Sequence, residues 1–510
     1  MSTPVKAPSF VNRLFAKTSI DALRDEKRPQ HLRRALGSRD LIAIGLGTMI
    51  GGGIFTTIGP GVHLAGPAII LAFVLAGLTS FFAALCYAEL GAMVPIAGSA
   101  YTYAYATLGQ VVAWIIGFAL LFEYGISAAP VAQQFSSALQ GMLQFFGITL
   151  PHWAQTSNFI FDPNHWWNVT RWDILHSQFD IIGATFVLLL SLLLTLGIRE
   201  TATTNNVFVV LKIAALVVFV IFGFSLFKFS NLVPFAPHGW GSLRPFGGGG
   251  SVLPPGIIPA AGLVFFSYIG FDTATTTAEE CRNPARDIPV GVIGALLIGT
   301  VIYCVVAVML VGIVPWQQVD QTAALAKAIA PLHNPFVNWT ITMGVLAGTT
   351  SVALASLLGQ TRIFYVMARD NMLPPFVARI HPRFKTPALM TMITGAGVAL
   401  LTLVVPLTDL LSLVNIGTLA AFIVVCAGVI WLRVKRPDIP RPFRSPFVPW
   451  FPLTGIAMAL ALIAFGLNVR TVYWFLGAMA VGLVIYFCYG FRKSKPEQPR
   501  SHELPESLES

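Results

Sequence analysis

Long apolar stretches recur along the chain and are separated by short polar segments. A membrane-spanning helix needs about 20 predominantly apolar residues. Twelve stretches fit this requirement: 41–61, 67–93, 110–140, 180–198, 203–228, 254–278, 288–314, 337–366, 387–405, 408–432, 450–468 and 471–491. The pattern therefore predicts an all-α polytopic membrane protein with twelve transmembrane helices.

The first apolar stretch is interrupted by glycine. Its sequence, LIAIGLGTMIGGGIFTTIGPG, has three consecutive glycines at positions 51, 52 and 53. Glycine costs about 1 kcal/mol relative to alanine inside a helix. Unwound backbone at membrane depth is tolerated only where it is buried in protein or lines a cavity. We interpret Thr48 to Ile54 as a break between two half-helices that faces a binding site. The alternative is a seam of small residues at which two helices pack closely.

The sixth apolar stretch contains a second interruption. In VFFSYIGFDTATTTAEE, residues 264–280, Gly270 and Asp272 interrupt the apolar pattern, and threonines follow them. Interrupted segments at corresponding positions of two halves indicate a transporter binding site. Breaks in the first and sixth stretches fit a 5+5 inverted repeat plus two extra helices. Helix packing alone explains such a pair of breaks less easily.

The ends of two half-helices offer binding chemistry without ionised side chains. A helix N-terminus has unpaired N–H groups and about half a positive charge, which suits a carboxylate. A helix C-terminus presents carbonyl groups, which suit an ammonium group. We therefore expect an α-amino acid to bind between the breaks. The expected binding residues are Ile50, Gly51, Gly52, Gly53, Phe266, Ser267 and Ile269. Phe266 is expected to close over the substrate; the alternative is an ordinary core aromatic residue.

One lysine lies deep in an apolar stretch. Lys212 is about ten residues from the inner end of the fifth stretch, which is roughly 15 Å of helix at 1.5 Å per residue. Ionisable residues at this depth are costly and indicate function by default. Burial favours the neutral form of a lysine, so Lys212 is a candidate proton carrier. The alternative is a permanent ion pair that locks helices together.

Other polar residues fall inside the apolar stretches. Glu123, in the third stretch, either lines the cavity or pairs with a polar neighbour. Glu89 near the inner end of the second stretch is interpreted as a structural or gate contact. Hydroxyls in the eighth stretch, among them Thr350 and Ser351, either face a cavity or bond to their own helix turn.

Composition and charge support the membrane assignment. Only 11% of the 510 residues are charged, against about 25% in soluble proteins. With both termini inside, twenty-six Lys and Arg residues fall in inner segments and five in outer ones, so the positive-inside rule predicts cytoplasmic termini. The net charge of +10 is explained by this distribution and not by nucleic-acid binding. None of the five cysteines is spaced as CxxC, so we expect neither a disulfide framework nor a metal site.

The chain divides into four parts. We expect a cytoplasmic arm at 1–40, a ten-helix transport core at 41–432, a loop with helices eleven and twelve at 433–491, and a disordered polar tail at 492–510. No segment between helices is long enough to form a soluble catalytic domain, and no cluster of His, Cys or carboxylate residues gathers at one depth. The sequence therefore argues against an enzyme and predicts no cofactor.

Several motifs resemble the amino acid–polyamine–organocation superfamily, and within it bacterial members of the cationic amino acid transporter family. They are GLGTMIGGGIF in the first stretch, PIAGSAYTYAYATLG after the second, NNVFVVLKIAAL in the fifth, FFSYIGFDTATTTAEECRNPARDIP in the sixth and LGQTRIFYVMARDNMLPPFVARIHPRFKTP after the eighth. The resemblance covers residues 36–490.

The resemblance implies the leucine-transporter-like fold, alternating access, and an amino acid bound between the first and sixth segments. It implies that Lys212 replaces a sodium ion near carbonyls around Gly45 and near Thr350 or Ser351. Phe266 matches the aromatic gate position. Relatives often have Ser or Thr where this chain has Gly52, so a hydroxyl contact to the substrate is missing.

We therefore expect a proton-coupled amino acid uptake transporter of the plasma or inner membrane, driven by the proton gradient. An amino acid exchanger without net proton flow and an amino-acid-binding membrane sensor are the alternatives. The chain alone favours neutral over cationic substrates, because Glu123 is the only acidic candidate for a cationic side chain.

Overall fold

The computed structural model describes residues 36–93, 99–157, 177–197, 202–241, 244–246, 254–276, 281–384 and 386–491. The tail predicted at 492–510 and most of the predicted arm at 1–40 lie outside these ranges. Within them the chain is helical, and the only β-type pairing is an isolated bridge between Leu36 and Cys281.

The helices follow one another with short connections. In the first half they are α3 (Ser38–Met49), α4 (Gly52–Ala65), α5 (Ile69–Met93), α6 (Ser99–Thr107), α7 (Gln110–Phe145), α8 (Ile181–Thr195) and α9 (Ala202–Gly223). In the second half they are α10 (Ile257–Val264), α11 (Thr273–Thr276), α12 (Pro284–Ile313), α13 (Ala324–Ile329), α14 (Pro335–Arg369), α15 (Ala388–Val404), α16 (Leu407–Lys435), α17 (Trp450–Gly466) and α18 (Val469–Ile485).

Apolar helices make up most of the described chain. Eight helical segments are long and apolar enough to cross a membrane, and three further apolar helices have 10–17 residues, namely α8, α15 and α17. The all-α, polytopic character predicted from the sequence is thereby confirmed. The number of twelve spans stays a prediction, because α4 and α5 run on as a single apolar segment, Gly52–Met93.

The outer helices expose apolar side chains instead of burying them. On α9, Val210 is 66% exposed and Ile221 is 64% exposed, and α8 exposes Leu189 and Leu192. Large exposed apolar surfaces mark contact with a partner or with a membrane. In helices of this length and hydropathy, the exposed faces are the ones expected to contact lipid.

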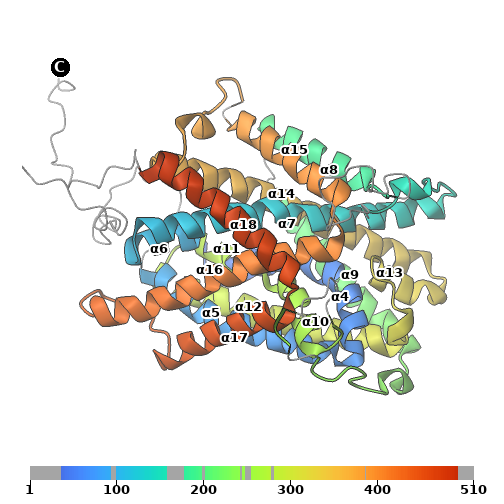
Figure 1. The fold of residues 1–510 in the computed structure, drawn as a ribbon. Coiled ribbons are helices and arrows are strands. Elements are labelled where there is room, and N and C mark those ends of the chain that lie inside the picture. The colour runs from blue at the N-terminus through green and yellow to red at the C-terminus, as the bar shows by residue number, and fades with distance from the viewer. Residues whose placement is uncertain are drawn as a thin grey trace, which may run out of the picture.

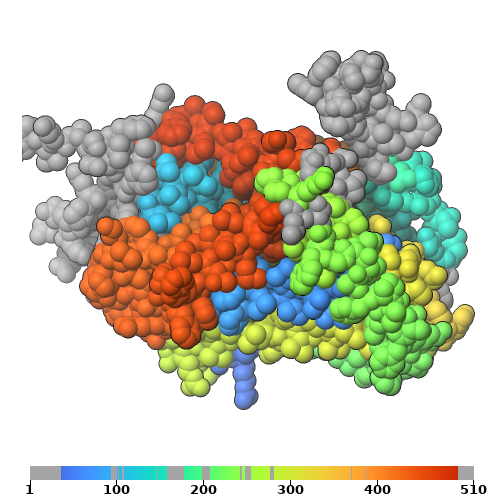
Figure 2. Space-filling model, turned by 60° about the horizontal axis from the view of Figure 1, so that its bottom comes forward, coloured from blue at the N-terminus to red at the C-terminus, as the bar shows by residue number. Residues whose placement is uncertain are grey.

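The helices form one elongated bundle (Figure 1). α7 packs along α14, α14 also packs against α9, and α12 packs against both α3 and α5. α6 lies at one end of the bundle and α13 at the opposite end (Figure 1). Figure 2 shows the same separation on the surface, with the orange residues of α16 and α17 towards one end and the green residues that follow α9 towards the other.

Two helices extend beyond what the apolar pattern indicated. The tyrosine-rich segment after the second stretch, predicted as an interfacial segment, contains the helix α6, and a short helix, α13, lies between α12 and α14. Both are too short to span a membrane, so neither produces an apolar stretch of the required length.

Candidate functional site

The first apolar stretch is broken at Ile50 and Gly51. α3 ends at Met49 and α4 begins at Gly52, with Ile50 extended at φ −80° and ψ 121° and Gly51 at φ 139°. A residue with a side chain rarely adopts a φ of that value, whereas glycine does so at little cost. Space is also restricted, because a Cβ atom on Gly51 would lie 2.7 Å from the carbonyl oxygen of Gly348 in α14.

The sixth apolar stretch is broken in the same manner. α10 ends at Val264 and continues as a 3₁₀ turn to Tyr268; Ile269 is extended and Gly270 has φ 111°. The chain becomes helical again only at Thr273. Both breaks therefore fall within the segments that the sequence analysis indicated.

The two breaks are in direct contact with each other. The hydroxyl of Thr48 donates to the carbonyl of Gly270 at 2.8 Å and lies 3.0 Å from the hydroxyl of Thr273. On the other side of the break, a Cβ atom on Gly53 would lie 2.5 Å from the Cα atom of Ser267. Glycine at position 53 is therefore what allows the two backbones to approach this closely.

The predicted binding residues lie together around these contacts. Ile50, the three glycines, Phe266 and Ser267 are buried, and Ile269 is half-buried. The N-terminus of α4 has no side-chain cap, so its N–H groups and the positive end of its dipole remain suited to an anion. The carbonyl of Phe266 accepts from the N–H of Ile269 at 3.2 Å, and a carbonyl oxygen has a second lone pair for an ammonium group.

The structure gives a reason for glycine at position 52. A Cβ atom there would lie 2.7 Å from Cγ2 of Val131 in α7 and 2.9 Å from Cγ1 of Val352 in α14. The two valines fill the space in which the hydroxyl residue of the similar family would stand. Nearby, the hydroxyls of Thr57 and Ser267 lie 2.7 Å apart, so hydroxyl groups are present beside the break from other positions.

Lys212 lies in α9 and its side chain is fully buried. Its ammonium group donates to the carbonyl of Gly47 and, at 3.1 Å, to the hydroxyl of Ser351. Gly47 is near the end of α3, just before the break, and Ser351 is in α14. One side chain therefore connects three helices that meet at the first break.

The other predicted partners of Lys212 lie close to this point. The carbonyl of Gly45, around which the resemblance placed the contact, accepts from the hydroxyl of Thr48 at 2.9 Å. The hydroxyl of Thr350 donates to the carbonyl of Leu346 at 2.7 Å, within its own helix. The acceptor for Lys212 in α3 is thus the carbonyl two residues after Gly45.

Glu123 is a buried carboxylate on α7. A Cβ atom on Gly417 of α16 would lie 3.7 Å from the Cβ of Glu123, so the glutamate faces α16. Among the described residues, its Oε2 atom has no hydrogen-bond partner. An unsatisfied buried oxygen of this kind is unusual in folded proteins, and its functional role stays a prediction.

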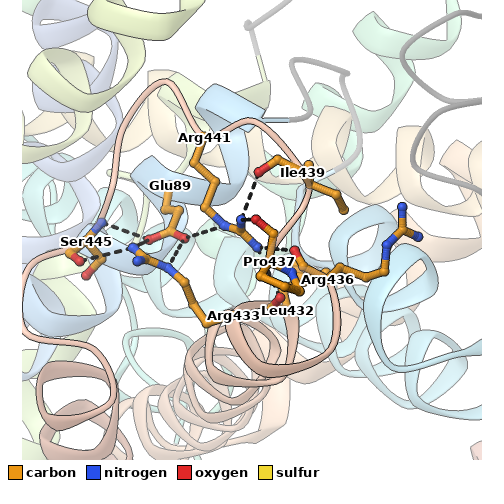
Figure 3. Close-up of polar contacts among 8 residues, drawn as sticks. All are labelled: Glu89, Leu432, Arg433, Arg436, Pro437, Ile439, Arg441 and Ser445. Carbon is orange, nitrogen blue, oxygen red and sulfur yellow. Dashed lines mark hydrogen bonds and ion pairs between the residues drawn. The ribbon is translucent and has the colours of Figure 1, made fainter.

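A buried cluster of charges closes one end of the bundle (Figure 3). Glu89 of α5 accepts two bonds of 2.9 Å from Arg433 of α16 and one of 2.8 Å from the backbone N–H of Ser445. Arg441 lies 3.4 Å from the same carboxylate, and the guanidinium also donates to the carbonyls of Leu432, Arg436 and Ile439. The sequence indicated Glu89 as a structural or gate contact but did not identify these partners, which lie more than 340 residues away.

Replacing Glu89 by glutamine is expected to destabilise the protein by about 3 kcal/mol, because removing one partner of a buried pair leaves an uncompensated charge. The Glu89 and Arg441 side chains are only 2% and 3% exposed. We expect a clearly lower thermal unfolding midpoint for Glu89→Gln in detergent. The matched control is Asp438→Asn, which breaks the exposed pair with Arg436 on the same loop and should leave the midpoint unchanged. Equal midpoints for both variants would contradict a stabilising role of the cluster.

Metal-binding groups were also sought. Within the described ranges, no three His, Cys, Asp or Glu side chains gather where they could hold a metal ion. The polar chemistry around the breaks is instead supplied by backbone groups, hydroxyls and one lysine.

The chain matches the model of a protein family described as "Amino acid permease" over residues 36–489. It is 38% identical to the branched-chain amino acid permease BcaP of Bacillus subtilis over 95% of this chain and 99% of that protein. It is 36% identical to the methylthioribose transporter of the same organism, over 94% of this chain and 98% of that protein. It is also 34% identical to the vacuolar cationic amino acid transporter 4 of Arabidopsis thaliana, over 84% of this chain and 68% of that protein. All of these proteins are named as permeases or transporters and not as enzymes.

Proposed function

Because the chain belongs to the amino acid permease family, we propose that it is a secondary active transporter that takes up amino acids by alternating access. The observation that carries the proposal is the direct contact between two broken helices, at Thr48–Gly270 and at Gly53–Ser267. It supports the predicted arrangement of twelve spans with two inverted five-helix repeats and two extra helices. In this arrangement, the amino acid lies between the breaks.

The two ends of the amino acid backbone find complementary groups in this proposal. The α-carboxylate is held by the N–H groups of Gly51, Gly52 and Gly53 at the positive end of α4. The α-amino group is held by the carbonyls of Phe266 and Ile269. Each interaction needs only a charge and a backbone group, so it would serve any α-amino acid.

The side chain of the substrate is proposed to be neutral and apolar. Its expected surroundings are Ile50, Phe266 and Val131, which are apolar and buried. Burying a charged side chain among such residues costs far more than burying an apolar one. The name of the branched-chain amino acid permease BcaP supports the same class. Glu123 remains the candidate cavity residue for a cationic substrate, as the name of the Arabidopsis relative suggests.

Lys212 is proposed to couple transport to protons. When charged, its ammonium group bonds to Gly47 and Ser351 and holds α3 to α9 and α14 at the first break. Loss of the proton would remove the charge and one donor, which would weaken this connection. Substrate entry, a change in the protonation of Lys212, closure over the substrate and opening to the inside then form one cycle.

The protein is proposed to lie in the plasma or inner cell membrane with both termini in the cytoplasm. In this orientation, α6 and the Glu89 cluster are at the inner end and α13 is at the outer end. The excess of Lys and Arg in the segments assigned to the inside supports this orientation.

The test is uptake of labelled leucine and labelled lysine into proteoliposomes, with and without an inward proton gradient. Accumulation of leucine above its external concentration, only when the gradient is present, would support proton-coupled uptake of neutral amino acids. Preference for lysine would reverse the substrate class. Uptake that ignores the gradient but is accelerated by internal amino acid would favour the exchanger. Saturable binding without flux would favour a sensor.

A further inference from the structure

A second cavity lies away from the two breaks, under the short helix α13. It has a volume of about 240 Å³ and is lined by residues from the C-terminal half of α7, the N-terminal half of α14 and the segment 323–330, with Phe55 of α4. Sites for drug-sized ligands have volumes of about 300–1,000 Å³, so this cavity suits a smaller molecule. No role in the proposed transport cycle uses it.

One buried polar group in this cavity lacks a partner. Gln134 is only 4% exposed, and its Nε2 atom donates to the carbonyl of Thr322 at 2.9 Å. A carbonyl can only accept, so this bond fixes the orientation of the amide. The opposite atom, Oε1, is then an acceptor, and it is buried without a hydrogen-bond partner among the described residues. Leaving a buried acceptor unpaired is costly.

The rest of the lining is mostly apolar and includes aromatic rings. Phe55, Met142, Leu325 and Trp339 are among the lining residues. Aromatic rings and methionine sulfur favour contact with a flat aromatic ring. A charged ligand would lose its hydration here without a free counter-ion, because the cation in the lining, Lys327, is paired with Asp320.

The segment above the cavity is held in place by Asp320. Its Oδ1 atom accepts from the backbone N–H groups of Thr322 and Ala323, at 2.9 Å and 2.8 Å. Although burial acts to raise the pKa of Asp320, the hydrogen bonds from Lys327 and from these N–H groups lower it to about 2. The carboxylate is therefore ionised throughout the physiological range, and the cavity keeps its upper wall.

We propose that this cavity binds a small, flat, largely apolar molecule with a single N–H or O–H donor, such as an indole. The donor bonds to Oε1 of Gln134, and the ring lies against Phe55, Met142 and Trp339. Indole nitrogen donates and does not accept, so it complements a single buried acceptor. Occupancy would link α13 to α7 and α14.

The experiment is calorimetric titration of indole into the full-length protein in nanodiscs. Benzofuran has the same shape as indole but replaces the N–H donor by an oxygen acceptor, so it serves as the matched ligand. We expect saturable binding of indole and at least tenfold weaker binding of benzofuran. Equal affinities, or no saturable binding of indole, would overturn the proposal. Neither outcome depends on transport, so the test is separate from that of the proposed function.

Two variants locate the site. Gly141 lines the cavity, and a Cβ atom there would meet no atom within 4 Å, so Gly141→Phe should fill the space and abolish indole binding. The control is Gly477→Phe on α18, where a Cβ atom would also meet nothing within 4 Å; it should bind as the wild type does. Gln134→Leu should weaken binding about tenfold. Unchanged indole affinity in Gly141→Phe would place any binding elsewhere and overturn the proposal.

Discussion

Replacing Lys212 by methionine is expected to abolish the accumulation of amino acid that a proton gradient drives in proteoliposomes. The side chain is fully buried and connects the carbonyl of Gly47 with the hydroxyl of Ser351. Methionine has a similar length but neither a proton to exchange nor a donor. The variant would leave two buried polar groups short of a partner, at a cost of about 1–3 kcal/mol for each. We therefore also expect a lower thermal unfolding midpoint.

The control for Lys212→Met is Lys228→Met, which removes an exposed lysine from the segment after α9. It should accumulate amino acid as the wild type does. Exchange of labelled for unlabelled amino acid, measured without a gradient, separates loss of coupling from loss of folding. If Lys212→Met still accumulates amino acid in response to the gradient, Lys212 is a structural residue, and the exchanger becomes the better description.

Replacing Gly53 by alanine is expected to weaken amino acid binding by about 10- to 100-fold. The added Cβ atom would lie 2.5 Å from the Cα atom of Ser267, and backbone atoms cannot move aside as the end of a flexible side chain can. The two breaks must then separate. Overpacking of this kind typically costs about 1–3 kcal/mol, and each 1.4 kcal/mol corresponds to about tenfold in affinity.

Binding of labelled amino acid to the purified protein measures this effect directly. The matched control is Gly397→Ala on α15, where a Cβ atom would meet nothing within 4 Å. That variant should bind amino acid with wild-type affinity and show an equal or higher unfolding midpoint, because alanine is favoured over glycine in a helix. Wild-type affinity in Gly53→Ala would show that the amino acid does not bind between the two breaks.

The positions of the two breaks could be predicted because they depend on local chemistry. Gly51 and Gly270 have φ values of 139° and 111°, which glycine adopts far more readily than other residues. An apolar stretch containing glycine at such points signals a break whatever the rest of the fold does. The same argument located Lys212, since a charge in the middle of an apolar stretch is visible in the sequence alone.

The partners of these residues could not be derived in the same way. The carbonyl that accepts from Lys212 is that of Gly47, and the choice between it and Gly45 depends on how α3 is rotated against α9. The arginines around Glu89 lie on a different helix and on the loop after it. Nothing in the local sequence distinguishes Arg433 and Arg441 from other inner-side arginines. The cavity beside Gln134 also depends on how α7, α13 and α14 are brought together.

The contact between Gly51 and Gly348 has a genetic consequence. A Cβ atom on Gly51 would lie 2.7 Å from the carbonyl oxygen of Gly348, and one on Gly348 would lie 2.9 Å from the Cα atom of Gly51. When two side chains clash, shrinking one can rescue an enlarged neighbour. Glycine has nothing left to remove, so no substitution at either position can compensate for one at the other. In a screen for second-site suppressors, mutations of Gly51 should be rescued only from outside this contact.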